Sequence, residues 1–486
     1  MSTKATQKNN LFTGFAKQDA DNVSACFGES FDIIRREILF GDTSLFVFVL
    51  DGMCDEIKIT ESLIKPLTEP YPEASEEKLQ TKIKKRLFKG TNIKEINSSE
   101  EAALNIILGN VILICDGEKT ALSFPLQGFP KKAINEPQTE QNERGPQEGF
   151  TDNFKDNVTL LRRRLRTPEL VLKQFNAGKT SNTPIIVCYL KDRIDAEILK
   201  EIEKRISNMN LEAVLGSGYI RPFLDTRRPS FFSDTGITER PDTLAAMLLE
   251  GRIGIIVDGT PFVLIVPYLF IDYFHATDDY LSSTYYAFFM RILRIVSFII
   301  ASVLPGAFVA ICLFHPEIMP ADIMYGISAA TGKTPFPIMI EALTIHFIYE
   351  IVREAGLRMP RAVGHAVSIV GALVIGDAAV SAGLIAAPML IIVALTAISS
   401  SVTVKLHEPV AIMRFGFILI GGFTGLYGIM LGLGLMIIDI CSVSPYGVPL
   451  SAPLSPFIAN AQNDTIFRKS WTNAKRKKNL IGEMKS

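Results

Sequence analysis

The pattern of apolar and polar residues changes near residue 284. Before it, apolar runs are short, as in LFVFVLDG (45–52) and PIIVCYLKD (184–192), and they alternate with amphipathic helical stretches. After it, several apolar runs approach or exceed the length of a membrane-spanning helix. Short apolar runs are typical of buried strands, whereas runs of about 20 residues are typical of membrane spans. The sequence therefore predicts an α/β region followed by an α-helical polytopic membrane domain.

A repeat divides the α/β region in two. GNVILICDGEKTALSFP (109–125) and GRIGIIVDGTPFVLIVP (251–267) align at a constant offset of 142 residues. Both indicate a strand, an Asp-Gly turn and a second strand, and each follows an amphipathic helix. We therefore expect two related α/β subdomains, at 35–134 and 183–283, after a flexible N-terminus at 1–34.

The stretch between these subdomains, 135–182, is predicted to be a linker that ends in a basic helix. Its LRRRLR sequence (161–166) suits a solvated or phosphate-seeking helix face. It equally suits a helix that docks on lipid headgroups or on the second subdomain. No aromatic residues interleave with these arginines, as a single-strand-binding platform requires, so we expect no nucleic-acid partner.

Five apolar runs predict a multi-spanning membrane domain at 284–458. The first, 295–314, contains no charge, and Arg291 and Arg294 precede it, which places its start in the cytoplasm. Five crossings would leave the basic tail, 459–486, outside, whereas its charge favours the cytoplasm. Either one run re-enters, or the proline-rich stretch 441–457 dips into the bilayer. We give the tail charge more weight than the number of runs. The other four runs are 335–356, 362–384, 387–404 and 415–438.

The third run consists largely of small residues and carries one carboxylate. Small residues let helices pack closely, which is the structural explanation. The functional alternative is a narrow pathway, because carboxylate rings and hydrophobic constrictions select and gate cations. One stripe of this helix, spaced by four, three and four residues, holds the pore or gate candidates Val370, Val374, Asp377 and Ser381.

The second run carries charges that are costly in a bilayer. Glu350, Arg353 and Glu354 share a helix face with His346, so an ion-pair network between helices is the preferred interpretation. Glu341 projects from roughly the opposite side without a charged partner on its own face. We therefore regard Glu341 as a candidate contact for ions, a neighbouring subunit or a second protein.

Composition agrees with a membrane protein, since 48% of the residues are hydrophobic and the mean hydropathy is +0.25. The first thirty residues contain no apolar run suited to a signal peptide, so we expect a cytoplasmic α/β region. The six cysteines lack CxxC spacing and predict reduced thiols. GISAATGKT (326–334) is out of register with a phosphate loop, and the histidines lack zincin spacing. We expect no enzymatic activity, no cofactor and no metal.

A series of motifs in one order resembles the A subunits of bacterial spore germinant receptors, the GerA family, which also includes the SpoVAF paralogue. The resemblance covers about residues 140–457. Its motifs include ERGPQEGF (143–150), ERPD (239–242), PFPIMIEAL (335–343), YEIVREAGLRMP (349–360), VIGDAAVSAGLIAAP (374–388) and YGVPLSAPLSP (446–456).

The resemblance implies residence in the spore inner membrane with a transporter-like, nutrient-binding B subunit and a lipoprotein C subunit. It also implies a homo-oligomeric, pentameric cation channel that opens when the B subunit binds a nutrient. Within ERGPQEGF it marks Arg144, Gly145, Pro146 and Glu148 as an interdomain motif. Two alternatives stay open: a non-conducting scaffold or signalling subunit, and a SpoVAF-like paralogue that amplifies ion release.

Overall fold

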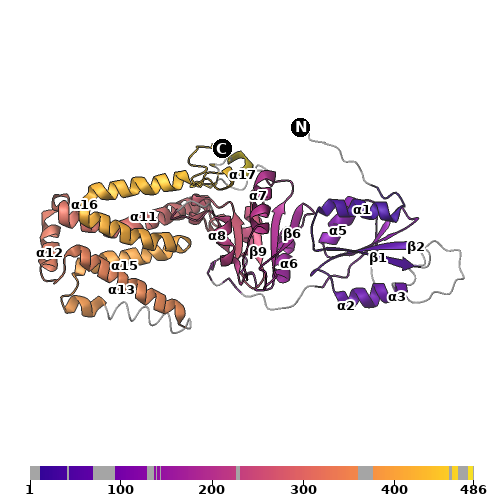
Figure 1. Cartoon of the computed structure of the whole chain (residues 1–486), viewed down its shortest axis with the longest axis horizontal. Helices are drawn as coiled ribbons and strands as arrows, with labels where there is room; N and C mark the ends of the chain where they lie inside the picture. Colours follow the sequence, from indigo (N-terminus) through magenta and orange to yellow (C-terminus); the bar gives the residue numbers. More distant parts are fainter. Residues whose placement is uncertain are drawn as a thin grey trace.

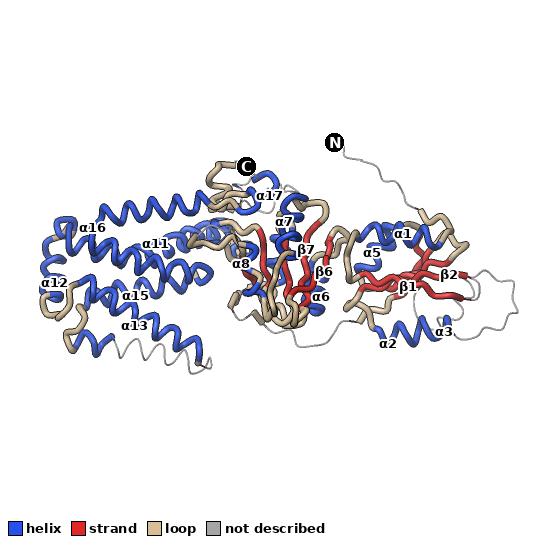
Figure 2. The backbone as a smooth tube through the Cα atoms, viewed as in Figure 1, coloured by secondary structure: helices blue, strands red, loops and turns tan. Residues whose placement is uncertain are grey.

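The chain forms two α/β subdomains and a helical region arranged in a row (Figure 1). All strands belong to the two subdomains, and the long helices lie at the opposite end (Figure 2). This arrangement confirms the predicted fold class. The computed structural model describes residues 11–40, 43–68, 93–128, 136–137, 139–142, 144–225, 230–359, 376–458, 462, 464–468 and 480–484.

The first subdomain is an antiparallel sheet with helices on both faces. Its strand order is β1-β2-β4-β5-β3. Alternate residues of β2 point to opposite faces: Phe46 and Phe48 pack under α1 and α5, and Leu45 and Val47 pack under α2 and α3. The strands are β1 (Ile33–Phe40), β2 (Thr43–Leu50), β3 (Lys94–Ile96), β4 (Val111–Cys115) and β5 (Ala121–Phe124); the helices are α1 (Ala16–Phe27), α2 (Glu56–Ile59), η1 (Thr60–Ile64), α3 (Lys65–Thr68) and α5 (Ser99–Ile107).

The second subdomain repeats this sheet in the order β6-β7-β9-β10-β8. The repeated sequence forms the hairpins β4–β5 and β9–β10, and Gly117 and Gly259 in their turns have φ of 81° and 82°. α6 and β6 of this subdomain lie inside 135–182, the range predicted to be a linker that ends in a basic helix; α6 contains most of that helix, whereas β6 was not expected there. The strands are β6 (Leu170–Ala177), β7 (Thr183–Leu190), β8 (Gly236–Thr238), β9 (Ile253–Val257) and β10 (Val263–Val266); the helices are α6 (Phe154–Arg164), α7 (Ala196–Ser207), η2 (Ser217–Tyr219), α8 (Arg221–Leu224), α9 (Pro241–Leu248), η3 (Phe270–Phe274) and α10 (Asp278–Leu281).

Arg162 of the basic helix joins the two subdomains. Its guanidinium is fully buried and donates to both carboxylate oxygens of Asp32, at 2.8 and 2.9 Å. It also donates to the carbonyl of Leu170 at 2.9 Å, and to Ser30. A bidentate arginine–carboxylate pair fixes orientation as well as distance. Of the interpretations of LRRRLR, the structure therefore supports a packing role for this arginine.

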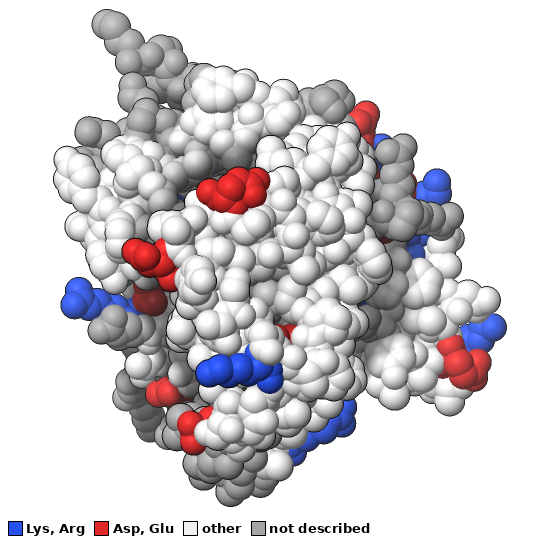
Figure 3. All heavy atoms as spheres, turned by 90° about the vertical axis from the view of Figure 1, so that its left-hand side faces the viewer, with Lys and Arg blue, Asp and Glu red and all other residues white. Residues whose placement is uncertain are grey.

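Among its described residues, the helical region contains two segments that are long and apolar enough to cross a membrane, α11 and residues 404–442. Figure 3 views the end of the helical region that lies farthest from the two α/β subdomains, and few charged side chains are seen on this face. We call the two α/β subdomains together the soluble region. The helices are α11 (Thr284–Phe314), η4 (Pro316–Ile318), α12 (Ala321–Thr331), α13 (Ile338–Arg358), α15 (Ala387–Val402), η5 (Val404–Leu406) and α16 (His407–Ser442).

α16 is a hairpin of two helical arms, although its central sequence suggests a single span. Gly425 breaks the helix with φ 65° and ψ −155°. The arms fold against each other, since a Cβ built on Gly432 would lie 2.7 Å from Phe417. Each arm, 407–424 and 426–442, would extend about 26 Å at 1.5 Å per residue. Both ends of α16 therefore lie near the second subdomain.

The proline-rich stretch after α16 packs on the second subdomain. The Leu450 carbonyl accepts a hydrogen bond from Phe270 N at 2.9 Å, and the Tyr446 hydroxyl donates to the Leu224 carbonyl at 2.8 Å. Val448 and Leu450 are fully buried in the same hydrophobic cluster as Ile255 of β9. Protein therefore covers the irregular backbone of this stretch. The structure shows 441–457 packed on the second subdomain, which differs from the alternative in which this stretch dips into the bilayer. The remaining short helices are η6 (Pro445–Gly447) and α17 (Leu480–Met484).

Candidate coupling site between the soluble and helical regions

Asp279 of α10 binds two arginines at the start of α11. Its carboxylate is 2% exposed and accepts hydrogen bonds from Arg294 at 2.7 and 2.9 Å and from Arg291 at 3.3 Å. Burial raises the pKa of Asp279, but the hydrogen bonds and charge of Arg294 outweigh burial, so the pKa is lowered overall. The ionised carboxylate therefore holds the first apolar helix against the soluble region.

A second buried ion pair lies beside the first. Arg252, immediately before β9, donates to both carboxylate oxygens of Asp272 in η3, one of them at 3.1 Å. Burial opposes both charges, yet mutual attraction prevails: the pKa of Arg252 is raised and that of Asp272 is lowered. Removing one partner of such a pair would leave a buried charge uncompensated, so the pair fixes η3 to the sheet.

His275 connects the ion pairs to the C-terminal segment. Its Nδ1 lies 3.9 Å from Asp272 Oδ1, and its Nε2 lies 2.8 Å from the Thr465 carbonyl oxygen. Burial, followed by the charge of Arg291, lowers the pKa of His275. The ring is therefore neutral at neutral pH, and Nε2 carries the proton because a carbonyl oxygen only accepts.

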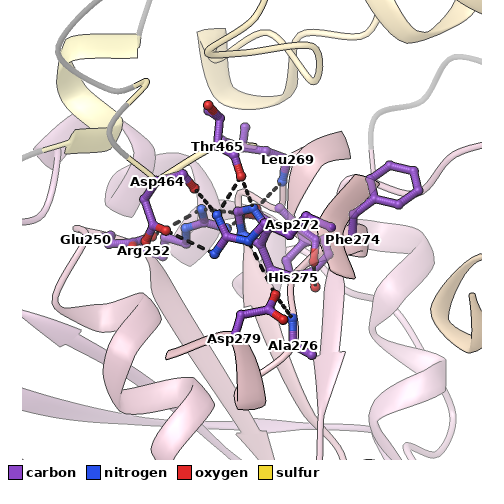
Figure 4. Close-up of polar contacts among 12 residues, drawn as sticks. Glu250, Arg252, Leu269, Asp272, Phe274, His275, Ala276, Asp279, Asp464 and Thr465 are labelled. Atoms are coloured by element: carbon purple, nitrogen blue, oxygen red, sulfur yellow. Dashed lines mark hydrogen bonds and ion pairs between the residues drawn. The ribbon is translucent and has the colours of Figure 1, made fainter. Parts of the chain in front are cut away.

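The C-terminal segment 464–468 completes this cluster (Figure 4). Arg291 donates to the Thr465 carbonyl at 2.6 Å and to Asp464 Oδ1 at 3.0 Å. Asp464 also accepts from the Tyr280 hydroxyl at 3.0 Å. Arg291 thus binds acceptors that lie more than 170 residues later in the chain. The C-terminal segment is therefore a structural part of the junction.

A second connection reaches the loop between α15 and α16. Lys405 in η5 lies 2.8 Å from Glu140 Oε1, while Glu140 Oε2 accepts from Thr238 and from Glu239 N. Burial raises the pKa of Glu140, and the charge of Lys405 outweighs burial, so the pKa is lowered. The segment before α6 therefore ties strand β8 to the helical region.

Arg240 holds that segment in place. Its guanidinium donates to the carbonyls of Glu140, at 3.2 Å, and Pro146, at 2.8 Å, and it forms a bidentate pair with Asp242. The ERPD sequence therefore provides both the arginine and the carboxylate that orients it.

The predicted interdomain motif occupies this same contact. Arg144 is exposed, Pro146 is the acceptor for Arg240, and Glu148 pairs with Arg163 and Arg164 of α6. Gly145 has φ 112°, and a Cβ there would lie 2.6 Å from the side chain of Leu281 in α10. The motif thus contacts both α6 and the short helix that carries Asp279.

An open cavity of about 940 Å³ lies beside the Lys405 connection. Among the described residues, no three His, Cys, Asp or Glu side chains are arranged to hold a metal ion. The groups assembled here are paired charges, so the arrangement can transmit movement between the two regions. The cavity lining includes Glu140, Thr238, Tyr268, Arg353, Lys405 and His407.

Comparison with known proteins shows which family this architecture represents. The family described as Bacillus/Clostridium GerA spore germination protein matches residues 21–480. The chain belongs to the GerA family. The resemblance drawn from the sequence motifs is therefore confirmed.

Two relatives of this GerA protein match over most of their lengths. Spore germination protein KA of Bacillus subtilis (strain 168) is 40% identical over 449 residues, which are 91% of this chain and 82% of the relative. The uncharacterized membrane protein YfkQ of the same organism is 34% identical, over 95% and 90% of the two chains. A crystal structure of the N-terminal domain of the A subunit of the Bacillus megaterium spore germinant receptor GerK3 is similar at 26% identity and a TM-score of 0.44, covering 54% of this chain and 99% of that one.

The charged residues predicted within α13 of this GerA protein separate into different contacts. Glu350 lies 3.1 Å from Arg353, and Glu354 pairs with Arg358 instead. The Nδ1 of His346 lies 2.8 Å from the carbonyl oxygen of Ala342, one turn earlier. Glu350 and Arg353 therefore form an ion pair with each other, and His346 and Glu354 make separate contacts.

Glu341 is buried against the start of α15. Its carboxylate accepts a hydrogen bond from Ala386 N and lies 3.5 Å from the Thr334 hydroxyl. The residue regarded as a contact for ions or a second protein is thus bonded within the chain.

Two of the pore or gate candidates belong to the described part of the chain. Asp377 and Ser381 are both exposed. Val370 and Val374 lie outside the described residues.

Sequence reasoning missed several members of these contacts. Arg414 of α16 is fully buried, donates to Glu350 at 3.1 Å and to the Ala301 carbonyl at 3.0 Å, and thus completes the network expected on α13. A charge inside an otherwise apolar stretch was the available signal for Arg414. No comparable signal marks Asp464, which lies in the polar tail.

Proposed function

We propose that this GerA protein is the A subunit of a spore germinant receptor and that it assembles into a pentameric, nutrient-gated cation channel in the spore inner membrane. A transporter-like B subunit that binds the nutrient and a lipoprotein C subunit would be its partners. The names of its relatives support the role in germination. The α/β region and the basic tail would face the cytoplasm.

The observation that carries the proposal is the double connection of the second subdomain to the helical region. Arg291 and Arg294 connect it to the start of α11, and Lys405 connects it to the loop before α16. Both connections are between charges that are largely buried. A displacement of the subdomain would therefore move two membrane elements together, as gating requires.

The exposed Asp377 and Ser381, with Val370 and Val374, are the residues that we propose line the pathway. A ring of carboxylates contributed by several copies would attract cations, and the valines would form the constriction. This assignment requires that the Asp377 carboxylate face the pathway in the oligomer.

The test is potassium release from spores that carry Asp377→Ala or Val374→Ala, after a nutrient pulse, with all receptor subunits confirmed present. We expect blocked release, or release without nutrient. Asp322→Ala, which removes an exposed carboxylate on α12, is the matched control and should release potassium normally. Normal release from both pathway variants at normal protein level would refute the pathway assignment.

A non-conducting scaffold is the alternative that one observation favours: Glu341, Glu350 and Arg353 are engaged within the chain rather than with a pathway. The oligomeric state in mild detergent separates the two functions, since a monomer or dimer could not surround a central pore. A SpoVAF-like role in amplifying ion release would instead be indicated if the protein supported release only in spores that contain another receptor.

A further inference from the structure

The second subdomain exposes large apolar side chains close to the helical region. Leu215 is 69% exposed, Tyr219 49%, Phe223 38% and Phe231 55%. We refer to these four residues as the aromatic segment. Leu215 and Tyr219 line one shallow hollow with Pro222. Ser233, two residues after Phe231, hydrogen-bonds both Arg221 and Asp225, which lie two residues before and after Phe223. A gathering of apolar side chains on a soluble surface is typical of a contact with a partner or a membrane.

Two contacts place this segment at the base of the α16 hairpin. Arg221 Nη1 lies 3.7 Å from Glu408 Oε2 at the start of the first arm. Phe231 N and the Ser230 hydroxyl donate to Asp439 Oδ2, at 3.2 and 3.0 Å, near the end of the second arm. The segment therefore lies at the two ends of α16, and α8 is on the side of the second subdomain that faces the helical region (Figure 1).

The apolar surface continues from the helix onto the segment. Ile437 and Ile438 of the second arm, which precede Asp439 directly, are 57% and 63% exposed. Since a hydrogen bond joins the Phe231 backbone N–H to Asp439, Phe231 lies next to this exposed stretch of the helix. Such exposed residues face lipid when a helix spans a bilayer, so lipid is the occupant that we assign to the neighbouring surface of Phe231.

We propose that the aromatic segment inserts into the headgroup layer of the bilayer that α16 spans. Phenylalanine and tyrosine rings suit this layer, because their apolar bodies enter it while polar groups stay hydrated. The second subdomain would thus contact the membrane directly, in addition to its connection through the helices. The proposal does not depend on whether the chain conducts ions.

The test uses single-tryptophan variants of the full chain, with Trp471 replaced by Phe, in liposomes that contain lipids brominated on their acyl chains. Bromine quenches a nearby indole. Tyr219→Trp and Phe231→Trp should be quenched at least twofold. Leu435→Trp, 66% exposed on α16, is the positive control, and Leu104→Trp, 51% exposed in the first subdomain, is the negative control.

Quenching of positions 219 and 231 at the level of Leu104→Trp would overturn the proposal. A blue-shifted emission without bromine quenching would also overturn it, because it would mean that protein, such as a second copy of the chain, covers the segment. Dilution of the protein in the bilayer then distinguishes the remaining explanations: quenching that persists supports lipid contact, and quenching that appears only on dilution assigns the segment to an interface between copies.

Discussion

Replacing Asp279 by asparagine should loosen the junction between the soluble region and α11 by about 3 to 5 kcal/mol. The carboxylate accepts two hydrogen bonds from Arg294, one from Arg291 and one from Ala276 N, and both arginines remain largely buried when it is neutralised. Breaking a buried ion pair on one side typically costs this amount, because the charge left behind, here that of Arg294, is uncompensated, whereas Arg291 keeps Asp464.

Hydrogen exchange of the full chain in detergent measures this loss. The local opening free energy at residues 278–281 and 464–468 should fall, so that these amides exchange roughly 10²- to 10⁴-fold faster, since about 1.4 kcal/mol is a factor of ten. Arg294→Met should cost less, and the Asp279→Asn/Arg294→Met double variant should cost less than the sum of the two single changes.

The matched control is Glu201→Gln, which removes a carboxylate of the same subdomain whose partner, Arg205, is four residues away on α7. Its side chain is 43% exposed, so the loss should stay below about 1 kcal/mol. Similar, small effects of Asp279→Asn and Glu201→Gln would refute the reasoning that the Asp279 cluster holds the junction together.

Three further expectations concern other parts of the chain. Because the folded-state pKa of His275 is lowered, stability should be retained above its unfolded pKa of about 6.5 and decrease as the pH falls below that value. His275→Gln should flatten this pH dependence in thermal unfolding, and an unchanged pH profile would contradict the role of His275. Gly145→Ala should cost at least about 1 kcal/mol, because of its positive φ and the contact with Leu281, and should accelerate proteolysis of the segment before α6, whereas equal proteolysis would contradict the strain. The α16 hairpin predicts that the exposed Cys441 reacts with an impermeant thiol reagent from the side of the soluble region, and that Tyr427→Cys reacts only from the opposite side.

Much of the soluble fold could be predicted because its determinants are local. The short apolar run LFVFV and the Asp-Gly turns specify structure within a few residues, the offset of 142 residues shows that the pattern occurs twice, and both hairpins formed as expected. Ser98 accepts a hydrogen bond from Glu101 N and begins α5, as its position before an amphipathic stretch suggests.

The junction could not be predicted, because its contacts join distant parts of the chain. Arg162 could be solvated or buried on sequence grounds, and only the position of Asp32, 130 residues earlier, decides between these states. The apolar run 415–438 shows no charge before Asp439 that would reveal a break, and the left-handed backbone of Gly425 depends on the arms that pack around it. For the same reason Glu341 looked unpartnered until the fold brought the backbone of Ala386 to it.

The order of synthesis gives the tail contacts a further consequence. Arg291 precedes α11, yet two of its acceptors, Asp464 and the Thr465 carbonyl, leave the ribosome only after the last arm of α16. Until the helical region has been synthesised, the partners of this arginine are therefore Asp279 and water. The junction closes last, so a chain whose final helices are not in place leaves Arg291 with Asp279 as a partner but without Asp464 and the Thr465 carbonyl.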